Sequence, residues 1–194
     1  MSTLETNLVQ PSTGTTLTLG ASGDTISIPS GATIANSGTA TGFGLFTSYA
    51  IIADQKTQNT AGGTATSGSW QTRDLNTEIS DPDGIVSIST NQFTLAAGSY
   101  LIKWAAPAAD CASHQSRLYD VTGTAVVQVG TSEYSYTDYD ALYKSIGAAR
   151  VTPSGSNVYR IEHQVQTTKA TSGYGFEANF ATEMYTMVEI FKEA

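Results

Sequence analysis

The stretch Phe93–Pro107, FTLAAGSYLIKWAAP, decides the fold class of this chain. After its Ala-Ala-Gly turn signal, large apolar residues alternate with others, so that one side of an extended segment carries Tyr100, Ile102 and Trp104. Successive side chains of a β-strand point to opposite faces, and the alternation therefore predicts a strand with one face on a core. The opposite face would carry Leu101, Lys103 and Ala105.

Segments of the same kind recur from residue 45 to residue 194, separated by turn signals such as Asp81–Gly84 and Thr122-Gly123. Only residues 140–146 have a composition that allows a turn or two of helix. Eight or more short antiparallel strands in about 150 residues indicate an all-β domain, a β-sandwich. The predicted strands are 45–52, 70–79, 85–89, 92–95, 99–105, 116–121, 124–130, 159–166 and 183–192.

Residues 1–44 have a different composition from the rest of the chain. Of these residues 23 are Thr, Ser or Gly, and only Glu5 and Asp24 are charged. All ten Tyr and both Trp come later in the sequence. A segment with so little apolar surface cannot offset the cost of ordering its own backbone, so we expect it to depend on other chains for a core.

An imperfect repeat runs through this leader, because Thr16–Leu19, Thr25–Ile28 and Thr33–Asn36 are each followed by a Ser-Gly pair. Each copy predicts a very short strand and a glycine turn. Three copies in one chain cannot enclose a core, whereas three chains around a shared axis can. The sequence therefore predicts a trimeric β-stem over residues 16–44, and the alternative is a flexible linker. The residues expected to point inward are Leu17, Leu19, Ile26, Ile28 and Ile34.

The first residues of the chain, 1–15, carry Leu4, Leu8 and Val9 in a polar setting. This pattern predicts an arm that attaches to another protein, and a frayed end is the alternative.

Two parts of the sequence resemble known families. Phe93–Pro107 is similar to a segment of the jelly-roll heads of the complement globular domain and tumour-necrosis-factor group, and Tyr185–Lys192 is similar to that group's last strand. The leader Thr16–Gly44 resembles stem repeats of tailed-bacteriophage fibre and decoration proteins. Together these resemblances imply a homotrimer on a virion, with a thin stem and a jelly-roll knob formed by residues 45–194.

Composition excludes several classes of function. The net charge is -8, and no cluster of Lys or Arg is present to neutralise phosphates, which argues against a nucleic-acid partner. Charged residues make up only 13% of the chain, compared with about 25% in ordinary soluble domains. A single cysteine, Cys111, excludes an intramolecular disulfide. We find neither a signal peptide nor an apolar run long enough for a membrane span, and expect a virion protein made in the host bacterial cytoplasm.

Signals for catalysis or metal binding are weak. Asp110, Cys111 and His114 are close in sequence, but their spacing matches no nucleophile motif, and we expect Cys111 to be a small buried residue. His163 lies on the apolar side of its predicted strand and is expected in a core or between subunits. Asp81 and Asp83 could offer oxygens to Ca²⁺, but a complete calcium site needs about six or more oxygen ligands. We therefore predict no enzyme activity, no metal and no cofactor.

The strongest candidate for recognition is the run 133–143, EYSYTDYDALY, with four tyrosines and three acids. Exposed aromatic rings stack on sugars and anchor protein interfaces, while carboxylates accept hydrogen bonds from hydroxyl groups. The alternative is that these tyrosines pack between subunits of the trimer. A second loop, 168–175, is also expected to be exposed. The predicted receptor-binding residues are Tyr134, Tyr136, Asp138, Tyr139 and Tyr174.

The function favoured by these features is a non-enzymatic virion protein, a trimeric fibre or spike whose knob contacts a glycan or protein on the host surface. A trimeric capsid decoration protein, held through residues 1–15, is the alternative. A polysaccharide-cleaving tail spike would need paired carboxylates in a groove, for which Asp74, Glu78 and Asp81 are formal candidates. The leader argues against a fourth hypothesis, a cytosolic jelly-roll binding protein.

Overall fold

A computed structural model of the chain describes residues 9–33 and 45–193. The chain divides into two compact units, Met1–Ala40 and Thr41–Ala194. Within the described residues there is no helix, and all eleven strands belong to the second unit. The strands are β1 (Phe46–Lys56), β2 (Gln71–Thr72), β3 (Thr77–Ser80), β4 (Val86–Ser89), β5 (Gln92–Leu95), β6 (Tyr100–Ala109), β7 (Ala112–Asp120), β8 (Ala125–Ser135), β9 (Leu142–Val151), β10 (Asn157–Val165) and β11 (Glu183–Glu193).

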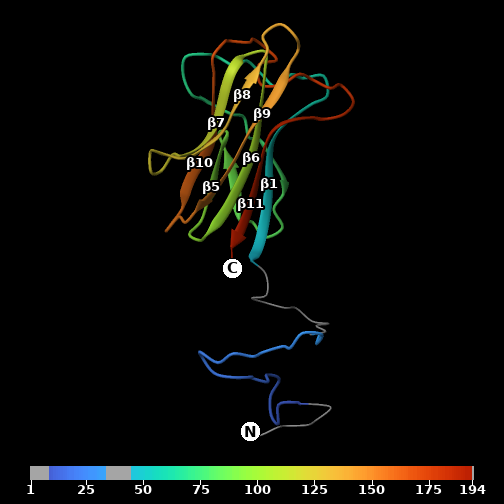
Figure 1. Ribbon diagram of the computed structural model, residues 1–194, viewed down its shortest axis with the longest axis vertical. Helices are drawn as coiled ribbons and strands as arrows, with labels where there is room; N and C mark the ends of the chain where they lie inside the picture. The colour runs from blue at the N-terminus through green and yellow to red at the C-terminus, as the bar shows by residue number, and fades with distance from the viewer. Residues whose placement is uncertain (1–8, 34–44, 194) are drawn as a thin grey trace. The chain divides into compact units, whose positions relative to one another are not determined.

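The strands form two sheets packed face to face as a jelly-roll sandwich (Figure 1). The five-stranded sheet has the order β3-β1-β11-β6-β9, and the six-stranded sheet has the order β4-β5-β10-β7-β8, with β2 paired to β10. Every pairing is antiparallel. Neighbours in each sheet are mostly distant in sequence, as β1 and β11 show. This arrangement confirms the predicted all-β sandwich.

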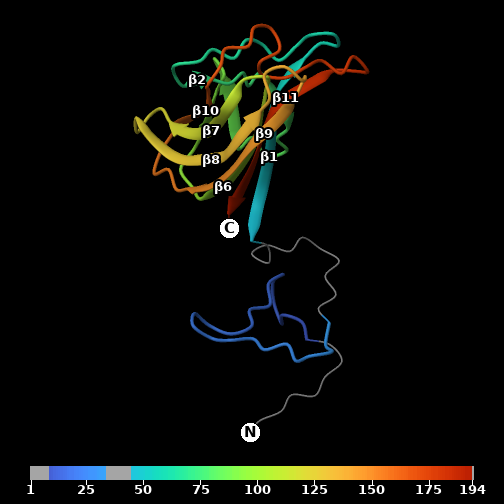
Figure 2. The same ribbon diagram turned by 45° about the horizontal axis from the view of Figure 1, so that its top comes forward.

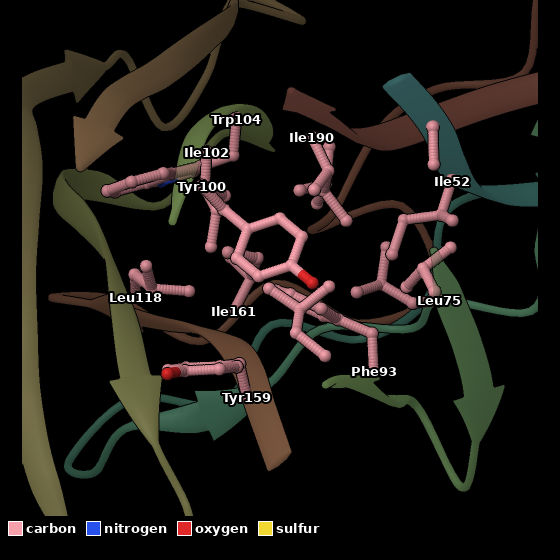
Figure 3. Packing of buried hydrophobic residues seen from close by; sticks show 14 of the residues in the cluster. Ile52, Leu75, Phe93, Tyr100, Ile102, Trp104, Leu118, Tyr159, Ile161 and Ile190 are labelled. Carbon is pink, nitrogen blue, oxygen red and sulfur yellow. The ribbon is translucent and has the colours of Figure 1, made fainter. Parts of the chain in front are cut away.

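The core lies between the two sheets and is built from the inward side chains of both (Figure 3). Tyr100, Ile102 and Trp104 of β6 are all buried, as the alternation in the sequence predicted. Opposite them, the six-stranded sheet contributes Leu118 of β7 and Ile161 of β10. Burial of such side chains supplies most of the favourable free energy of folding.

Strand β6 continues through Pro107 to Ala109, four residues beyond its predicted end at Ala105. Proline lacks an N–H and is tolerated where one side of a strand is unpaired. The pairing of β6 with β11 ends at Ala105, so Pro107 has only β9 as a neighbour.

Two expectations about the strands are wrong. Residues 140–146 do not form a helical turn, because from Leu142 onward they belong to β9, which is aligned with β6 over ten residue pairs. Residues 70–79 form two strands, since the chain leaves the six-stranded sheet after Thr72 and joins the five-stranded sheet at Thr77. Between them, the Arg73 side chain turns into the interior.

Residues 9–33 contain turns where the repeat predicts them, at Ser22-Gly23 and Ser30-Gly31. Of the predicted short strands, residues 16–19 and 25–28 are not strands in the described single chain, and the third, Thr33–Asn36, lies almost entirely outside the described residues. The trimeric stem therefore stays a prediction about the assembly. Leu17, Leu19, Ile26 and Ile28 are each at least 42% exposed, and Ile34 lies outside the described residues.

No helix in residues 9–33 and 45–193 has the length and apolarity needed to cross a membrane.

Candidate functional site

The tyrosine loop, which we define as Tyr134–Tyr139, connects β8 to β9 (Figure 1). It lies at the end of the sandwich opposite to Phe46 and Glu193, the paired ends of β1 and β11. Tyr134, Tyr136 and Tyr139 are 51%, 55% and 80% exposed. Their rings pack edge to face in series, with centroids 5.4 Å apart for the first pair and 6.1 Å apart for the second. The loop thus presents a continuous aromatic surface, and Asp138 lies exposed within it.

A buried aspartate holds the base of this loop. The Asp110 carboxylate accepts a hydrogen bond from the Ala141 backbone N–H at 3.0 Å, and its second oxygen forms an ion pair with Lys169 at 2.7 Å. The Asp110 backbone N–H also donates to the Ala141 carbonyl at 3.1 Å. The hydrogen bond to the Asp110 carboxylate raises the pKa of Lys169, which favours the charged form of the lysine. On the other side of the loop, the Cys111 backbone N–H donates to the Ser135 hydroxyl at 3.0 Å. Both sides are therefore anchored while the tyrosine rings stay exposed.

Tyr174 does not belong to this surface, and its predicted exposure is wrong. It is only 7% exposed, and the guanidinium carbon of Arg73 lies 3.8 Å from its ring centroid. The reason is the close packing of the loops around it. A Cβ at Gly62 would lie 2.6 Å from the Tyr174 backbone, and one at Gly173 would lie 2.6 Å from the backbone of Ala65. These glycines let the two loops meet backbone to backbone, which directs the tyrosine ring inward.

A groove of about 670 Å³ lies beside the tyrosine loop on the outer face of the six-stranded sheet. Of the lining residues on β7 and β10, Ser113, Gln115 and Gln164 point outward, whereas His114 and Val165 between and beside them point to the core. The sequence did not single out this groove, since its strands come from three separate parts of the chain. The lining residues are Trp70, Ser113, His114, Gln115, Ser132, Glu133, Tyr134, Gln164, Val165 and Gln166.

The two histidines of the chain meet beneath this groove, which sequence reasoning missed. The Nδ1 atom of His114 lies 3.0 Å from the Nε2 atom of His163, and the remaining ring nitrogens have no hydrogen-bond partner among the described residues. Burial lowers the pKa of His114 to about 4 and holds the pKa of His163 well below its usual value. Both imidazoles are therefore neutral at pH 7. As expected, His163 is a core residue, and its partner lies 49 positions earlier in the chain.

The residues considered for catalysis are engaged elsewhere. Cys111 is fully buried beside the Ser135 hydroxyl, as expected, and burial raises the pKa of its thiol, so it is not a poised nucleophile. Asp74 binds Lys56 at 2.8 Å. Asp81 accepts hydrogen bonds from the backbone N–H groups of Ile85 and Val86. In the described part of the chain, no three His, Cys, Asp or Glu side chains are grouped as metal ligands.

A second exposed surface covers the outer side of the five-stranded sheet. We call it the apolar face and define it by Tyr49, Ile51, Leu101, Ile146, Met187 and Phe191. Strand register places these residues in rows. Met187 lies opposite Ala105, which lies opposite Ile146. Four residues further along β11, Phe191 lies between Tyr49 and Leu101. Tyr49, Ile146 and Met187 are 44%, 53% and 37% exposed. The row between those of Met187 and Phe191 carries the ion pair of Lys103 and Glu189, so the apolar side chains lie around a charged pair. Exposed apolar residues gathered on one face of a sheet are typical of a protein interface.

Known structures share this sandwich. No protein-family model matches the sequence, and no curated protein matches it. PRD1 vertex protein P5 matches with a TM-score of 0.51 and 12% identity, covering 78% of this chain and 100% of that one. Lower scores are found for Eiger TNF from S. frugiperda (0.48, 12% identity, 75% and 92% covered) and for the globular domain of the zebrafish complement 1qA protein (0.45, 16% identity, 74% and 95% covered). At 12% identity the likeness to P5 shows the fold alone.

Proposed function

We propose that the chain is a structural protein of a virus particle, assembled as a homotrimer with a stem and a knob that contacts the host surface. The observation that carries the proposal is the apolar face, which a single chain leaves open to water. Similarity to a vertex protein of phage PRD1 supports a place on a virion as an analogy of fold.

Charges on and beside the apolar face favour burial against a second copy. Lys103 and Glu189 pair with each other at 3.5 Å on this side of the sheet, and Arg150 pairs with Glu193 at 2.6 Å. An interface that covered these pairs would not leave a single charge buried without a partner, which is the costly case. Aromatic residues and methionine, present here as Tyr49, Phe191 and Met187, are enriched in protein interfaces.

The leader supports the same assembly. Its aliphatic side chains are exposed in one chain, and three copies around an axis would bury them together. The residues concerned recur in step with glycine turns, a pattern that a linker does not need. A trimer would also present three tyrosine loops, so that weak individual contacts with a host receptor add up to firm attachment.

The first test is the oligomeric state of the purified chain. We expect sedimentation equilibrium to give three times the 20.4 kDa mass of one chain. The double variant Ile146→Asp and Met187→Asp places carboxylates on the apolar face and should dissociate the trimer, because both residues are exposed in the single chain and would be buried in the assembly.

Val126→Asp is the matched control for that experiment. Val126 is 45% exposed, like the interface residues, but belongs to β8 in the other sheet. The control should remain trimeric. A wild-type chain that sediments as a monomer at micromolar concentration, or an apolar-face variant that stays trimeric, would contradict the proposed assembly.

Capsid decoration uses the same architecture, with residues 1–15 gripping the shell. Gold labelling of a C-terminal tag on intact particles separates the two locations: label on the tail or vertices supports a spike, and label spread over the shell supports decoration. Particles without label would remove the virion proposal.

A further inference from the structure

The floor of the groove is a small grid of polar side chains on three neighbouring strands. In one row, Gln164 of β10 lies opposite Gln115 of β7, which lies opposite Ser132 of β8. In the next row on the same face, Ser113 lies opposite Tyr134. Neighbouring strands are about 4.8 Å apart, so these groups form a regular array of hydrogen-bonding positions.

Much of the hydrogen-bonding capacity of this grid is unused. Among the described residues, no side-chain hydrogen bond or ion pair engages the Gln164 amide. Gln115 donates to the Gly130 carbonyl at 2.9 Å and to the Ser132 hydroxyl at 3.2 Å, which fixes its orientation and leaves its carbonyl oxygen available. The His114 side chain points to the inner face of the sheet, where it meets His163, and is not part of this grid. The Gln164 amide and the Gln115 carbonyl are therefore the groups that a ligand in the groove could reach first.

Aromatic rings bound the grid on two sides. Tyr134 is half exposed at the side of the tyrosine loop. Trp70 also lines the groove. The guanidinium carbon of Arg117, which is two residues after Gln115 on β7, lies 4.0 Å from the centroid of the Trp70 ring. Arg117 is itself held by an ion pair with the buried carboxylate of Glu162. The indole is therefore positioned in advance, and aromatic rings of this kind offer apolar faces with polar edges.

The charge of the lining restricts the ligand. No Lys or Arg lines the groove, and the grid side chains on its outer face, Ser113, Gln115, Ser132 and Gln164, are uncharged. Amides and hydroxyls between two aromatic rings suit a ligand that has many hydroxyl groups and apolar ring faces but no negative charge. Neutral sugars have this combination, whereas phosphate- or sulfate-bearing ligands would find no cation.

We propose that this groove binds an uncharged oligosaccharide, with Trp70 and Tyr134 contacting sugar rings and Gln115 and Gln164 bonding their hydroxyl groups. The inference rests on the proposed function, in which the knob faces the host. The groove lies on the outer face of the six-stranded sheet and the apolar face lies on the outer face of the other sheet, so a trimer built through the apolar face leaves all three grooves accessible.

The experiment is a tryptophan fluorescence titration of the full chain. The probes are neutral hexasaccharides of glucose, galactose, mannose and N-acetylglucosamine, together with sulfated counterparts. Trp70 lines the groove and Trp104 is buried in the core, so a ligand in the groove should change the emission of Trp70 only. We expect at least one neutral probe to bind at millimolar concentration or below, and its sulfated counterpart to bind at least tenfold more weakly.

Variants place the binding in the groove. Trp70→Ala and Gln164→Ala should each weaken binding at least tenfold, measured by calorimetry because the first variant loses the fluorescent reporter. Val126→Ala, on the same strand as Ser132 but outside the groove lining, should bind like wild type. Trp104 emission and far-ultraviolet circular dichroism report whether each variant is folded.

Three results would overturn the inference: no binding of any neutral probe up to 10 mM (about the weakest range in which a sugar site is useful), preference for sulfated probes, or equal binding by the groove variants. The outcome is separable from the proposed function. If the chain is a trimer on particles but binds no neutral sugar, the proposed function stands and the sugar-binding groove is contradicted. If the chain is a monomer that binds neutral sugars, the groove stands and the proposed assembly is contradicted.

Discussion

Trp104 shows how one side chain in the core restricts a residue on another strand. Its indole N–H donates to the Ser116 hydroxyl at 2.8 Å, and its ring lies over the backbone of β9 at Gly147. A Cβ at Gly147 would lie 1.9 Å from that ring. Glycine at this position is therefore required by close approach, because any larger residue would displace the ring and its hydrogen bond.

We predict that Gly147→Ala lowers the free energy of unfolding by roughly 1–3 kcal/mol, the usual cost of overpacking a core. Gly155→Ala is the matched control, since a Cβ there meets no atom within 4 Å. Urea denaturation of both variants measures the difference. Equal stability of the two variants would show that the Trp104 ring moves without cost.

The buried histidine pair makes stability depend on pH. In the unfolded chain both imidazoles take up protons near pH 6.5. In the folded chain burial lowers the pKa of His114 to about 4, and burial, Arg73 and His114 lower that of His163 further. Between pH 4 and pH 6.5 the unfolded state therefore binds more protons than the folded state. Their contribution to stability is therefore complete above pH 6.5 and is lost as the pH falls toward 4.

We predict that wild type loses stability on the order of a few kcal/mol between pH 7 and pH 4.5 through these two residues. Glu133 partly offsets the effect, because its charge favours the protonated form of His114. The double variant His114→Gln and His163→Gln has no histidine left and should show a weaker pH dependence in urea denaturation series. If wild type and the double variant lost the same stability, the loss would be due to carboxylates and not to the histidines.

At the scale of elements, strand positions followed from local patterns where a strand faces the core on one side. β5 matches its predicted range of residues 92–95, and β11 matches its range to within one residue. The positions of β2 and β3 could not be predicted from the local pattern, because residues 73–76 carry the chain from one sheet to the other. Arg73 occupies the interior there, donating to the Thr186 hydroxyl and the Pro107 carbonyl at 2.8 Å each. A charged residue in a short polar segment gives no sign of such distant partners.

The leader allows a prediction about an element that only an assembly can complete. Ile26→Asp with Ile28→Asp should weaken the proposed stem, since carboxylates would be buried along its axis. We expect a lower melting temperature of the trimer, or its dissociation at micromolar concentration. Thr25→Asp with Ser27→Asp changes the same segment by the same charge on the other side and is the control. An unchanged trimer in the isoleucine variant would favour the flexible-linker alternative.

At the scale of the whole molecule, the sandwich separates its surfaces by direction. The apolar face and the groove lie on the outer sides of opposite sheets, and the tyrosine loop lies at the end opposite to Phe46 and Glu193. Figure 2 shows the same sheets from a second direction, with the connecting loops gathered at that end. Assembly and recognition can therefore use different parts of the knob.

The tyrosine loop gives the prediction at this scale. Tyr134→Ala, Tyr136→Ala and Tyr139→Ala together should weaken binding of the trimer to host cells at least tenfold, because exposed aromatic anchors account for much of the affinity of an interface. Binding of labelled protein to cells, measured with sedimentation of the same samples, separates attachment from assembly. Equal cell binding would exclude the loop as the recognition surface, and loss of the trimer would place these rings between subunits.

The all-β class and the inward residues of β6 and β10 followed from the sequence alone, because alternation and turn chemistry depend on residues next to each other in the chain. Of the tyrosines predicted to be exposed, Tyr134, Tyr136 and Tyr139 are exposed and Tyr174 is not. Only the tertiary structure decided which polar groups are buried. Arg73, His163 and Tyr174 lie inside because segments up to 113 positions away along the chain supply their partners. The groove has the same origin, since its residues become neighbours only when β7, β8 and β10 pair.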